Sequence, residues 1–269
     1  SAGNTCIIRP SRMSENTAKI MEKIISVLIL THNAPDYVEE TIVTLNEITQ
    51  KEDRESMEII VLDNASEDLT KEILLKLKEK NYIDKLHFSN VNTLFAKGNN
   101  LASELASKSS KYYLLLNSDI KINLPQWLQN LLKLKEKEKC NAISYGVCFE
   151  PVRCDGYCFL IERELYDYYR LDESFEWFWS ITKIQAQLLR DGYSLVGIKN
   201  HNKYLYHYGG KSGFDFLGAK GMDIQQKEVL SWYGKKQVKV LDFFKLLTIY
   251  SKIKLHLLSK TKKIINAKL

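Results

Sequence analysis

The sequence lacks any apolar run near the ~20 residues that a helix needs to cross a bilayer, so it predicts no membrane-spanning segment. Its five cysteines form no Cys-x-x-Cys pair, which argues against a zinc site or a disulfide framework and favours a reducing compartment; only Cys154 and Cys158 are spaced so that they could pair. The regions of a signal peptide are also missing. We interpret residues 1–20 as a leader or a cloning remnant, and Met21 as the expected start.

The main body of the chain also lacks a net positive charge. The net charge of the 269 residues is +6, but residues 235–269 hold ten lysines and one acid, which gives +9, and the preceding 234 residues carry −3. This argues against a nucleic-acid groove in the main domain. With 45% hydrophobic and 11% aromatic residues, the chain can bury a substantial core, and neither a disordered nor a fibrous protein fits.

What the sequence does contain is a repeated order of apolar strand, polar turn and helix. This order predicts an open α/β fold with a mostly parallel central sheet flanked by helices. No linker or repeat divides the chain, so we expect one domain over residues 21–234 and a tail over 235–269. The expected strands are 24–30, 58–62, 87–89, 112–116, 141–150, 155–161, 193–198 and 203–207, and the expected helices are 37–48 (with Asp36 as N-cap), 69–80, 98–108, 127–137 and 182–190.

Three of the expected strands end in polar residues. The ends are Thr31-His-Asn33, Asp63-Asn-Ala-Ser66 and Asn117-Ser-Asp119. In open α/β sheets, ligands bind beyond the carboxyl ends of the strands. Any one of these turns could be a plain turn, but together they favour a ligand site.

Four ordered motifs in this region resemble those of a known family. They are Ile25-Ser-Val-Leu-Ile-Leu-Thr-His-Asn33, Glu58-Ile-Ile-Val-Leu-Asp-Asn-Ala-Ser66, Phe95-Ala-Lys-Gly-Asn-Asn100 and Leu114-Leu-Leu-Asn-Ser-Asp119. In order and spacing they resemble the family 2 glycosyltransferases of the GT-A fold, most closely the rhamnosyltransferase-like bacterial members. The resemblance covers residues 24–213. It implies inverting transfer of a sugar from a nucleoside-diphosphate donor to a glycan or lipid-linked acceptor in bacterial surface polysaccharide synthesis.

The resemblance also implies roles for single residues at the donor. Thr31 and Asn33 would line the nucleotide pocket, and Asp63 would accept a hydrogen bond from the base. Lys97 and the turn Gly98-Asn99-Asn100 would lie near the ribose or the diphosphate. A pyrophosphate needs cations, and a lysine beside a glycine that permits close backbone approach suits that need. The alternative is a solvated lysine before a helix.

A divalent cation is the cofactor that the resemblance implies. Asp119 matches the last carboxylate of the family's Asp-x-Asp motif, and Asn117 stands at the first position. Mg²⁺ or Mn²⁺ prefers oxygen ligands and bridges carboxylates to substrate phosphates. His207 matches a late histidine of the family near the metal, although a lone histidine at a strand end can also be structural.

The expected catalytic base is where the sequence departs from the family. The stretches Leu171-Asp-Glu-Ser-Phe175 and Gly192-Tyr193 fall in register, but Trp179-Ser-Ile-Thr-Lys183 offers no carboxylate where an acidic pair should stand. Three interpretations stay open. A nearby acid, Glu176 first and then Glu173 or Asp172, serves as the base; the chemistry differs; or the protein binds donors without turnover, as a scaffolding homologue. A nucleotidyltransferase-like enzyme is disfavoured, because no Gly-rich, basic signature follows the first strand.

Two further segments carry hypotheses about partners. Seven aromatic residues within 166–179 could form a platform for an acceptor sugar or could be core. The lysines of the tail alternate with apolar clusters, and no Gly or Pro interrupts residues 238–269. This pattern predicts a basic amphipathic helix on an anionic membrane, and hence a cytoplasmic protein peripheral to the inner face of the cell membrane. The alternative is a helix that packs on the domain or mediates oligomerisation.

Overall fold

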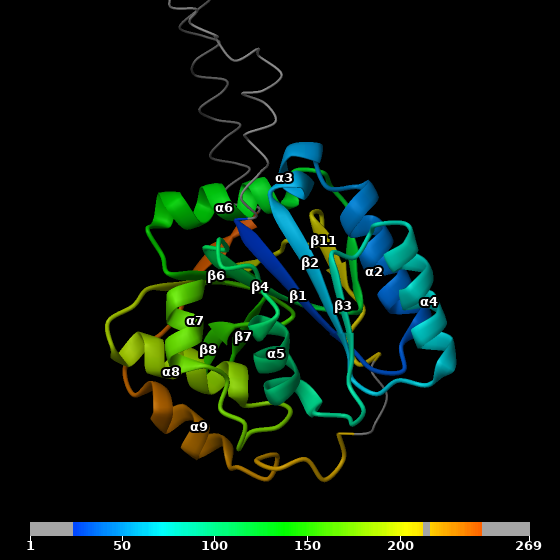
Figure 1. Ribbon diagram of the computed structural model, residues 1–269. Helices are drawn as coiled ribbons and strands as arrows, with labels where there is room; N and C mark the ends of the chain where they lie inside the picture. Colours follow the sequence, from blue (N-terminus) through cyan, green and yellow to red (C-terminus); the bar gives the residue numbers. More distant parts are fainter. Residues whose placement is uncertain (1–23, 212–215, 244–269) are drawn as a thin grey trace, which may run out of the picture.

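A computed structural model describes residues 24–211 and 216–243 of the chain. Helices cover both faces of a central sheet (Figure 1). In chain order the elements are β1 (Ile25–Thr31), α2 (Pro35–Glu47), α3 (Lys51–Glu55), β2 (Met57–Asp63), α4 (Asp68–Glu79), β3 (Lys85–Phe88), α5 (Leu94–Glu104), β4 (Tyr112–Asn117), β5 (Ile120–Ile122), α6 (Trp127–Glu138), β6 (Ala142–Tyr145), β7 (Val147–Phe149), β8 (Val152–Cys154), β9 (Cys158–Glu162), α7 (Arg163–Tyr169), α8 (Ser180–Arg190), β10 (Leu195–Lys199), β11 (Leu205–His207), α9 (Gln226–Tyr233) and β12 (Lys239–Asp242).

The main sheet has eight strands in the order β12-β10-β6-β9-β4-β1-β2-β3. All neighbours are parallel except at β9, which runs antiparallel to both β4 and β6. The mostly parallel sheet predicted from the sequence is therefore confirmed. The direction of β9 was not predicted, and it brings the amino end of β9 to the carboxyl end of β4.

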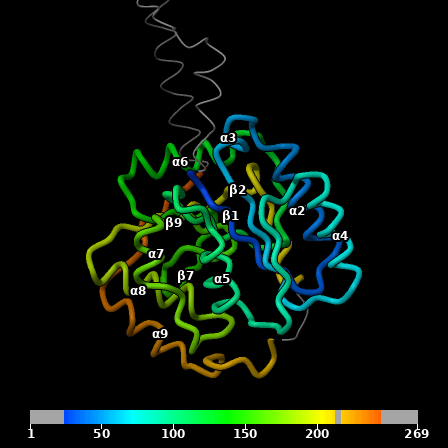
Figure 2. The backbone as a smooth tube through the Cα atoms, viewed as in Figure 1, coloured from blue at the N-terminus to red at the C-terminus, as the bar shows by residue number. Residues whose placement is uncertain are grey.

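Burial on both faces explains why β1 and β2 are apolar throughout. On one face, Ile25, Val27 and Ile29 pack with the apolar sides of α2, α4 and α6. On the other, Leu28 packs with residues of α5, α7 and α8. The tube view in Figure 2 shows α2 and α4 on one side of the sheet and α7, α8 and α9 on the other. The result is a three-layer arrangement with a rigid sheet whose carboxyl edge can carry a site.

The chain beyond residue 234 differs from the helical tail that we expected. Residues Lys239–Asp242 form β12, which pairs in parallel with β10 at the edge of the sheet, and Val238 and Phe243 are buried. The run Val238 to Leu241 can do so because β-branched and apolar residues suit a pleated surface. The sheet therefore extends past the predicted boundary. The remainder of the tail and residues 1–20 lie outside the described residues.

One smaller difference concerns the start of a helix. Helix α2 begins at Pro35, so Asp36 stands in its first turn and is not the N-cap. Proline at the first helical position is favourable because its missing N–H is not needed there. None of the helices in the described ranges is long and apolar enough to span a membrane.

Candidate functional site

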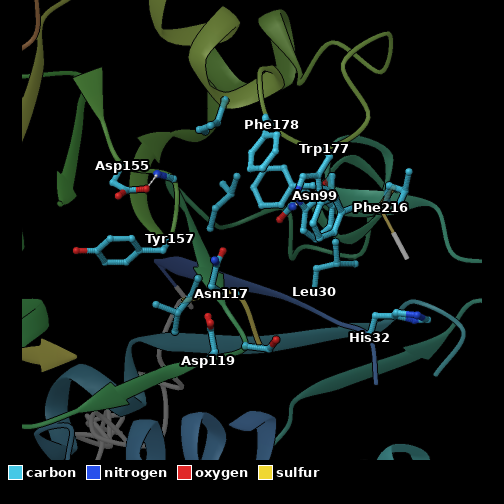
Figure 3. Close-up of a pocket in the computed structure, with 18 of the residues that line it drawn as sticks. Leu30, His32, Asn99, Asn117, Asp119, Asp155, Tyr157, Trp177, Phe178 and Phe216 are labelled. Atoms are coloured by element: carbon cyan, nitrogen blue, oxygen red, sulfur yellow. Dashed lines mark hydrogen bonds between the residues drawn. The ribbon is translucent and has the colours of Figure 1, made fainter. Parts of the chain in front are cut away.

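A cavity of about 590 Å³ opens at the carboxyl ends of β1 and β4 (Figure 3). Its polar and aromatic lining comes from seven separate stretches of the chain. The polar and aromatic lining residues are Thr31, His32, Asn64, Asn92, Phe95, Asn99, Asn117, Ser118, Asp119, Arg153, Asp155, Tyr157, Trp177, Phe178, Trp179, His207 and Phe216. A ligand site beyond the polar strand ends is where the sequence predicted one.

Strand pairing places these regions together. Leu30 of β1 is in register with Asn117 of β4, so the turns that follow the two strands are neighbours. The backbone N–H of Asn117 donates to the carbonyl oxygen of Tyr157 at 2.9 Å, which fixes the turn before β9 against the end of β4. The cavity therefore has one wall from β1, β2 and β4 and another from the segment before β9.

Asp119 and His207 meet at the floor of the cavity. The Asp119 side chain is nearly buried, with its residue 3% exposed, and Nε2 of His207 lies 3.2 Å from its Oδ1. The antiparallel pairing of β11 with β5, in which His207 is opposite Ile120, makes this contact. The imidazole stacks on the ring of Tyr157 at 4.2 Å between centroids, so its position is set by packing as well as by pairing.

The two side chains suit a cation only if a ligand supplies further oxygens. Among the described residues, no group of three or more His, Cys, Asp or Glu side chains gathers at one point that could hold a metal. A hard divalent cation is often bound by one or two protein groups together with substrate phosphates. The Asp119–His207 pair fits a site in which protein groups and substrate phosphates bind the cation together. It does not fit a site in which the protein supplies all the ligands.

The ends of β1 and β2 contribute buried oxygen atoms. Thr31 lines the cavity, and its Oγ1 has no hydrogen-bond partner among the described residues. Asp63 lies behind the lining; its Oδ2 accepts from the N–H of Ser66 at 3.1 Å, and its buried Oδ1 has no partner in the same ranges. A buried acceptor without a donor is costly, which is the expected state of a group that completes its bonds with a ligand.

Asn33 is not part of the lining. Its side-chain Oδ1 accepts from the N–H of Glu67 at 2.7 Å, and its own N–H donates to Oγ of Ser66 at 2.9 Å. It therefore ties the turn after β1 to the turn after β2. The lining residues of these turns that the sequence did not single out are His32 and Asn64, joined by a 2.8 Å contact between His32 Nδ1 and the Asn64 carbonyl oxygen.

Helix α5 holds the motif that includes Lys97, Gly98 and Asn99, and of these three only Asn99 lines the cavity. Lys97 is exposed on the helix surface. Gly98 is buried, and a Cβ there would lie 2.6 Å from Cδ1 of Leu30. The glycine thus permits a close approach of the helix to β1, which positions the lining residue next to it.

The three acids predicted to act as base do not line the cavity. Oδ1 of Asp172 accepts from the N–H and hydroxyl of Ser174, at 3.0 and 2.6 Å. Oε1 of Glu173 accepts from Nδ2 of Asn100 at 3.0 Å, and Oε2 of Glu176 accepts from the N–H of Lys220 at 2.7 Å. Each carboxylate is thus engaged in holding a loop.

Helix α8 begins at the position where the family's acidic pair was expected. Its first turn contains no acid. The hydroxyls of Ser180 and Thr182 are buried and have no partner among the described residues. The structure thus agrees with the sequence that the first turn of α8 supplies no carboxylate.

The aromatic stretch divides between the two interpretations. Trp177, Phe178 and Trp179 line the cavity, with Trp177 stacked on Phe216 at 4.8 Å and 7° between planes, whereas Tyr166 is a buried core residue. Phe178 is 52% exposed, so its ring is accessible to a ligand. Some of these rings thus line the cavity and others belong to the core, and the acceptor platform stays a prediction.

Two charged lining residues, Arg153 and Asp155, were missed in the sequence. They come from β8 and the turn that follows it, and Nε of Arg153 is buried without a partner in the described ranges. The sequence shows the turn Asp155-Gly156 before a strand, but a parallel strand would place that turn at the opposite edge of the sheet. Only the antiparallel direction of β9 brings it here.

Comparison with known proteins agrees with this geometry. The sequence model described as "Glycosyl transferase family 2" matches residues 26–189. The chain belongs to glycosyl transferase family 2. No curated protein matches the transferase.

Solved structures resemble the transferase in fold. The mannosyltransferase PcManGT from Pyrobaculum calidifontis, in complex with GDP-Man and Mn²⁺, is 17% identical at a TM-score of 0.55 over 64% of this chain and 53% of its own. S. aureus TarS 1–349 in complex with UDP-GlcNAc is 14% identical at a TM-score of 0.54. The match covers 78% of this chain and 71% of the TarS chain. The transferase thus spans about half of the mannosyltransferase. Identities this low show the fold alone.

Proposed function

We propose that this family 2 transferase moves a sugar from a nucleoside-diphosphate donor to a hydroxyl of a glycan or lipid-linked acceptor, with inversion, in bacterial surface polysaccharide synthesis. The observation that carries the proposal is the Asp119–His207 pair, 3.2 Å apart at the floor of a cavity beyond the carboxyl ends of β1 and β4. Solved relatives of the fold hold GDP-Man with Mn²⁺ and UDP-GlcNAc, which supports a sugar nucleotide as the donor.

The nucleotide belongs at the ends of β1 and β2 in this proposal. Thr31 and Asp63 each present a buried oxygen without a partner among the described residues, and a base or ribose can supply the missing donors. Asn99 and Asn117 line the path from there to Asp119. Lys97 is exposed outside the lining, so we do not assign it to the diphosphate.

Asp119 and His207 would hold the Mg²⁺ or Mn²⁺. When bound, the cation supplies positive charge where the leaving diphosphate becomes negative. The protein's own part is to keep a carboxylate oxygen and an imidazole nitrogen side by side, which the β5–β11 pairing and the Tyr157 stack do.

Donor turnover tests the proposal. The wild-type chain would be incubated with GDP-mannose, UDP-N-acetylglucosamine and a dTDP-deoxyhexose, the last because of the rhamnosyltransferase-like motifs, each with and without Mn²⁺. We expect one donor to raise the thermal midpoint by mass action, and the same donor to be hydrolysed or transferred. Absence of binding by every donor would contradict a sugar-nucleotide site.

The second candidate is a homologue that binds donors without turning them over. The absence of an acid in the first turn of α8 favours it, because a base is needed to activate the acceptor. It predicts a thermal shift with a donor but neither transfer nor hydrolysis. The turnover assay above separates the two candidates.

Membrane association is a further part of the proposal and is supported by charge. Residues 244–269 contain seven lysines and no acidic residue. Each lysine near an anionic membrane surface contributes about 1 kcal/mol to binding. A full-length variant with these lysines changed to glutamine should lose sedimentation with phosphatidylglycerol vesicles, whereas phosphatidylcholine vesicles should bind neither form. Equal sedimentation of the two forms would contradict it. Truncation at residue 234 is unsuitable, because it would remove β12 from the sheet.

A further inference from the structure

A sugar transfer of the proposed kind needs a group that removes the proton of the acceptor hydroxyl. The position where the family resemblance places that group has no acidic side chain. The first turn of α8 has none, and Asp172, Glu173 and Glu176 are engaged in loops outside the lining. The carboxylates of the lining are then the next candidates for the base, an inference that rests on the proposed function.

Two carboxylates are found in the lining that the structure describes, Asp119 and Asp155. Asp119 is paired with His207 and sits where a diphosphate and its cation would be held. Asp155 is not in an ion pair with any described residue within 4 Å, and it stands in the turn between β8 and β9. It is thus the carboxylate left for a role other than donor binding.

Two hydrogen bonds hold the backbone of Asp155, and a third orients its carboxylate. Its N–H donates to the Gly146 carbonyl oxygen at 3.1 Å, and its carbonyl oxygen accepts from Oγ of Ser144 at 2.7 Å. Its own Oδ1 accepts from the N–H of Gly156 at 2.8 Å. The Gly156 N–H and the Cys148 thiol thus orient the carboxylate, and Oδ2 is the oxygen that the Gly156 N–H does not occupy.

The position of Asp155 relative to the donor follows from strand order. Along the sheet, β2 and β1 carry the proposed nucleotide residues, β4 is followed by the turn with Asp119, and β9 is the next strand. The turn before β9 therefore lies beyond Asp119 on the side away from the nucleotide. Figure 3 shows Asp155 and Tyr157 on the opposite side of Asn117 from His32. This side of the cavity is thus open to a sugar attached to a diphosphate at Asp119.

We propose that Asp155 is the catalytic base of the transferase. Its Oδ2 accepts the proton of the acceptor hydroxyl as that oxygen forms a bond to the anomeric carbon. The bond from the anomeric carbon to the diphosphate oxygen breaks, and the nucleoside diphosphate leaves with the electron pair. With water as the acceptor, the same step hydrolyses the donor.

One cationic side chain and several other titratable groups surround Asp155. The guanidinium of Arg153 on β8 lines the same cavity. The other titratable groups that feel the charge of Asp155 are Tyr157 just before β9, His201, Cys148 and Cys154. Burial, and then the charge of Asp155, raise the pKa of the Cys148 thiol on β7, so that this neighbour stays neutral at pH 7. No second carboxylate among the described lining competes for the proton on this side.

Isosteric amide variants test the assignment. Asp155→Asn keeps an oxygen for the Gly156 bond but removes the base, so we expect kcat for transfer or hydrolysis to fall by about 10²- to 10⁴-fold with donor affinity unchanged. Glu176→Gln tests the acid favoured by the sequence and should change kcat by less than threefold. Glu79→Gln, an exposed acid at the end of α4, controls for a lost surface charge.

Several outcomes would overturn the assignment. Asp155→Asn with wild-type kcat, or with a loss confined to the acceptor KM, would make Asp155 a spectator or a binding group. A loss of kcat in Glu176→Gln of the size expected for Asp155→Asn would return the role to Glu176. Failure of the proposed function can be told apart from failure of the Asp155 assignment, because the wild-type protein would then bind no donor. A wild-type protein that binds a donor but never turns it over would overturn both the proposed transfer and the assignment of the base.

Discussion

Nε2 of His207 lies 3.2 Å from Oδ1 of Asp119, although the two residues belong to different ends of the family's motif pattern. Two short strands, β5 and β11, exist outside the main sheet and hold this pair together. A nearly buried carboxylate beside an imidazole is a costly arrangement without a cation or a proton to neutralise it. The relationship therefore points to a site prepared for a charged ligand.

Removing the charge of Asp119 should remove the metal dependence of donor binding. We expect Asp119→Asn to weaken Mn²⁺-dependent binding of a nucleoside diphosphate by about 10- to 100-fold, because contacts to charged groups contribute about 1.5–3 kcal/mol. Titration calorimetry with and without Mn²⁺ measures this. His207→Phe keeps a ring to stack on Tyr157 but removes the nitrogen, and should show a loss in the same direction. Unchanged affinity in Asp119→Asn would refute the metal assignment.

Gly146 controls the space behind Asp155 and Tyr157. It has φ +111°, and a Cβ there would lie 2.6 Å from the Tyr157 hydroxyl oxygen and 2.8 Å from Cβ of Asp155. Gly192 has φ +91° with open space around it, so Gly192→Ala carries the backbone strain alone. We expect Gly146→Ala to lose about 1–3 kcal/mol more unfolding free energy than Gly192→Ala in urea denaturation. Equal losses would show that the contact is not rigid.

Glu58 should make stability depend on pH in the acid range. Burial alone would raise the pKa of its carboxyl, but hydrogen bonds from Ser26 and Ser107 and the Lys85 ammonium, 3.0 Å away, lower it below its ordinary value of 4.5. A depressed folded-state pKa gives stability that is present above about pH 4.5 and is lost as the pH falls through the folded-state pKa.

The matching variant is Glu58→Gln. At pH 7 it should lower the unfolding free energy by about 1–3 kcal/mol, because the partners of a buried charged acceptor lose their bonds. Urea denaturation from pH 7 to pH 3 should also show a smaller fall in stability for the variant than for wild type. Parallel pH profiles would mean that Glu58 is not the titrating group.

Phe178 should contribute to acceptor binding and not to the chemical step. Its ring lines the cavity and is 52% exposed, and ring contacts are worth about 0.5–1.5 kcal/mol. We expect Phe178→Ala to raise the acceptor KM about two- to tenfold with kcat unchanged. Phe149→Ala is a matched control, because that ring is 61% exposed on β7 outside the lining. A similar KM change in both variants would indicate a general surface effect.

The sequence predicted those features that local pattern determines. Continuous apolar runs gave β1, β2 and β4, and the polar ends of β1 and β4 gave Thr31, Asn117 and Asp119 as lining residues. Strand direction is a non-local property, so the antiparallel β9 and the residues that it positions, Asp155 among them, could not be predicted from periodicity. For the same reason the residues of β12 were predicted as part of a helix, since its partner β10 is distant in the chain.

The insertion of β9 between β4 and β6 also has a consequence for the order of assembly. Until residues 158–162 have been synthesised, the side of β4 that pairs with them is an open edge with unpaired backbone groups. A nascent chain that ends after α6 already carries Asp119, but it has neither the opposite wall of the cavity nor His207. Ligand binding thus becomes possible only late in biosynthesis, and a fragment of the amino-terminal half should aggregate rather than bind a donor.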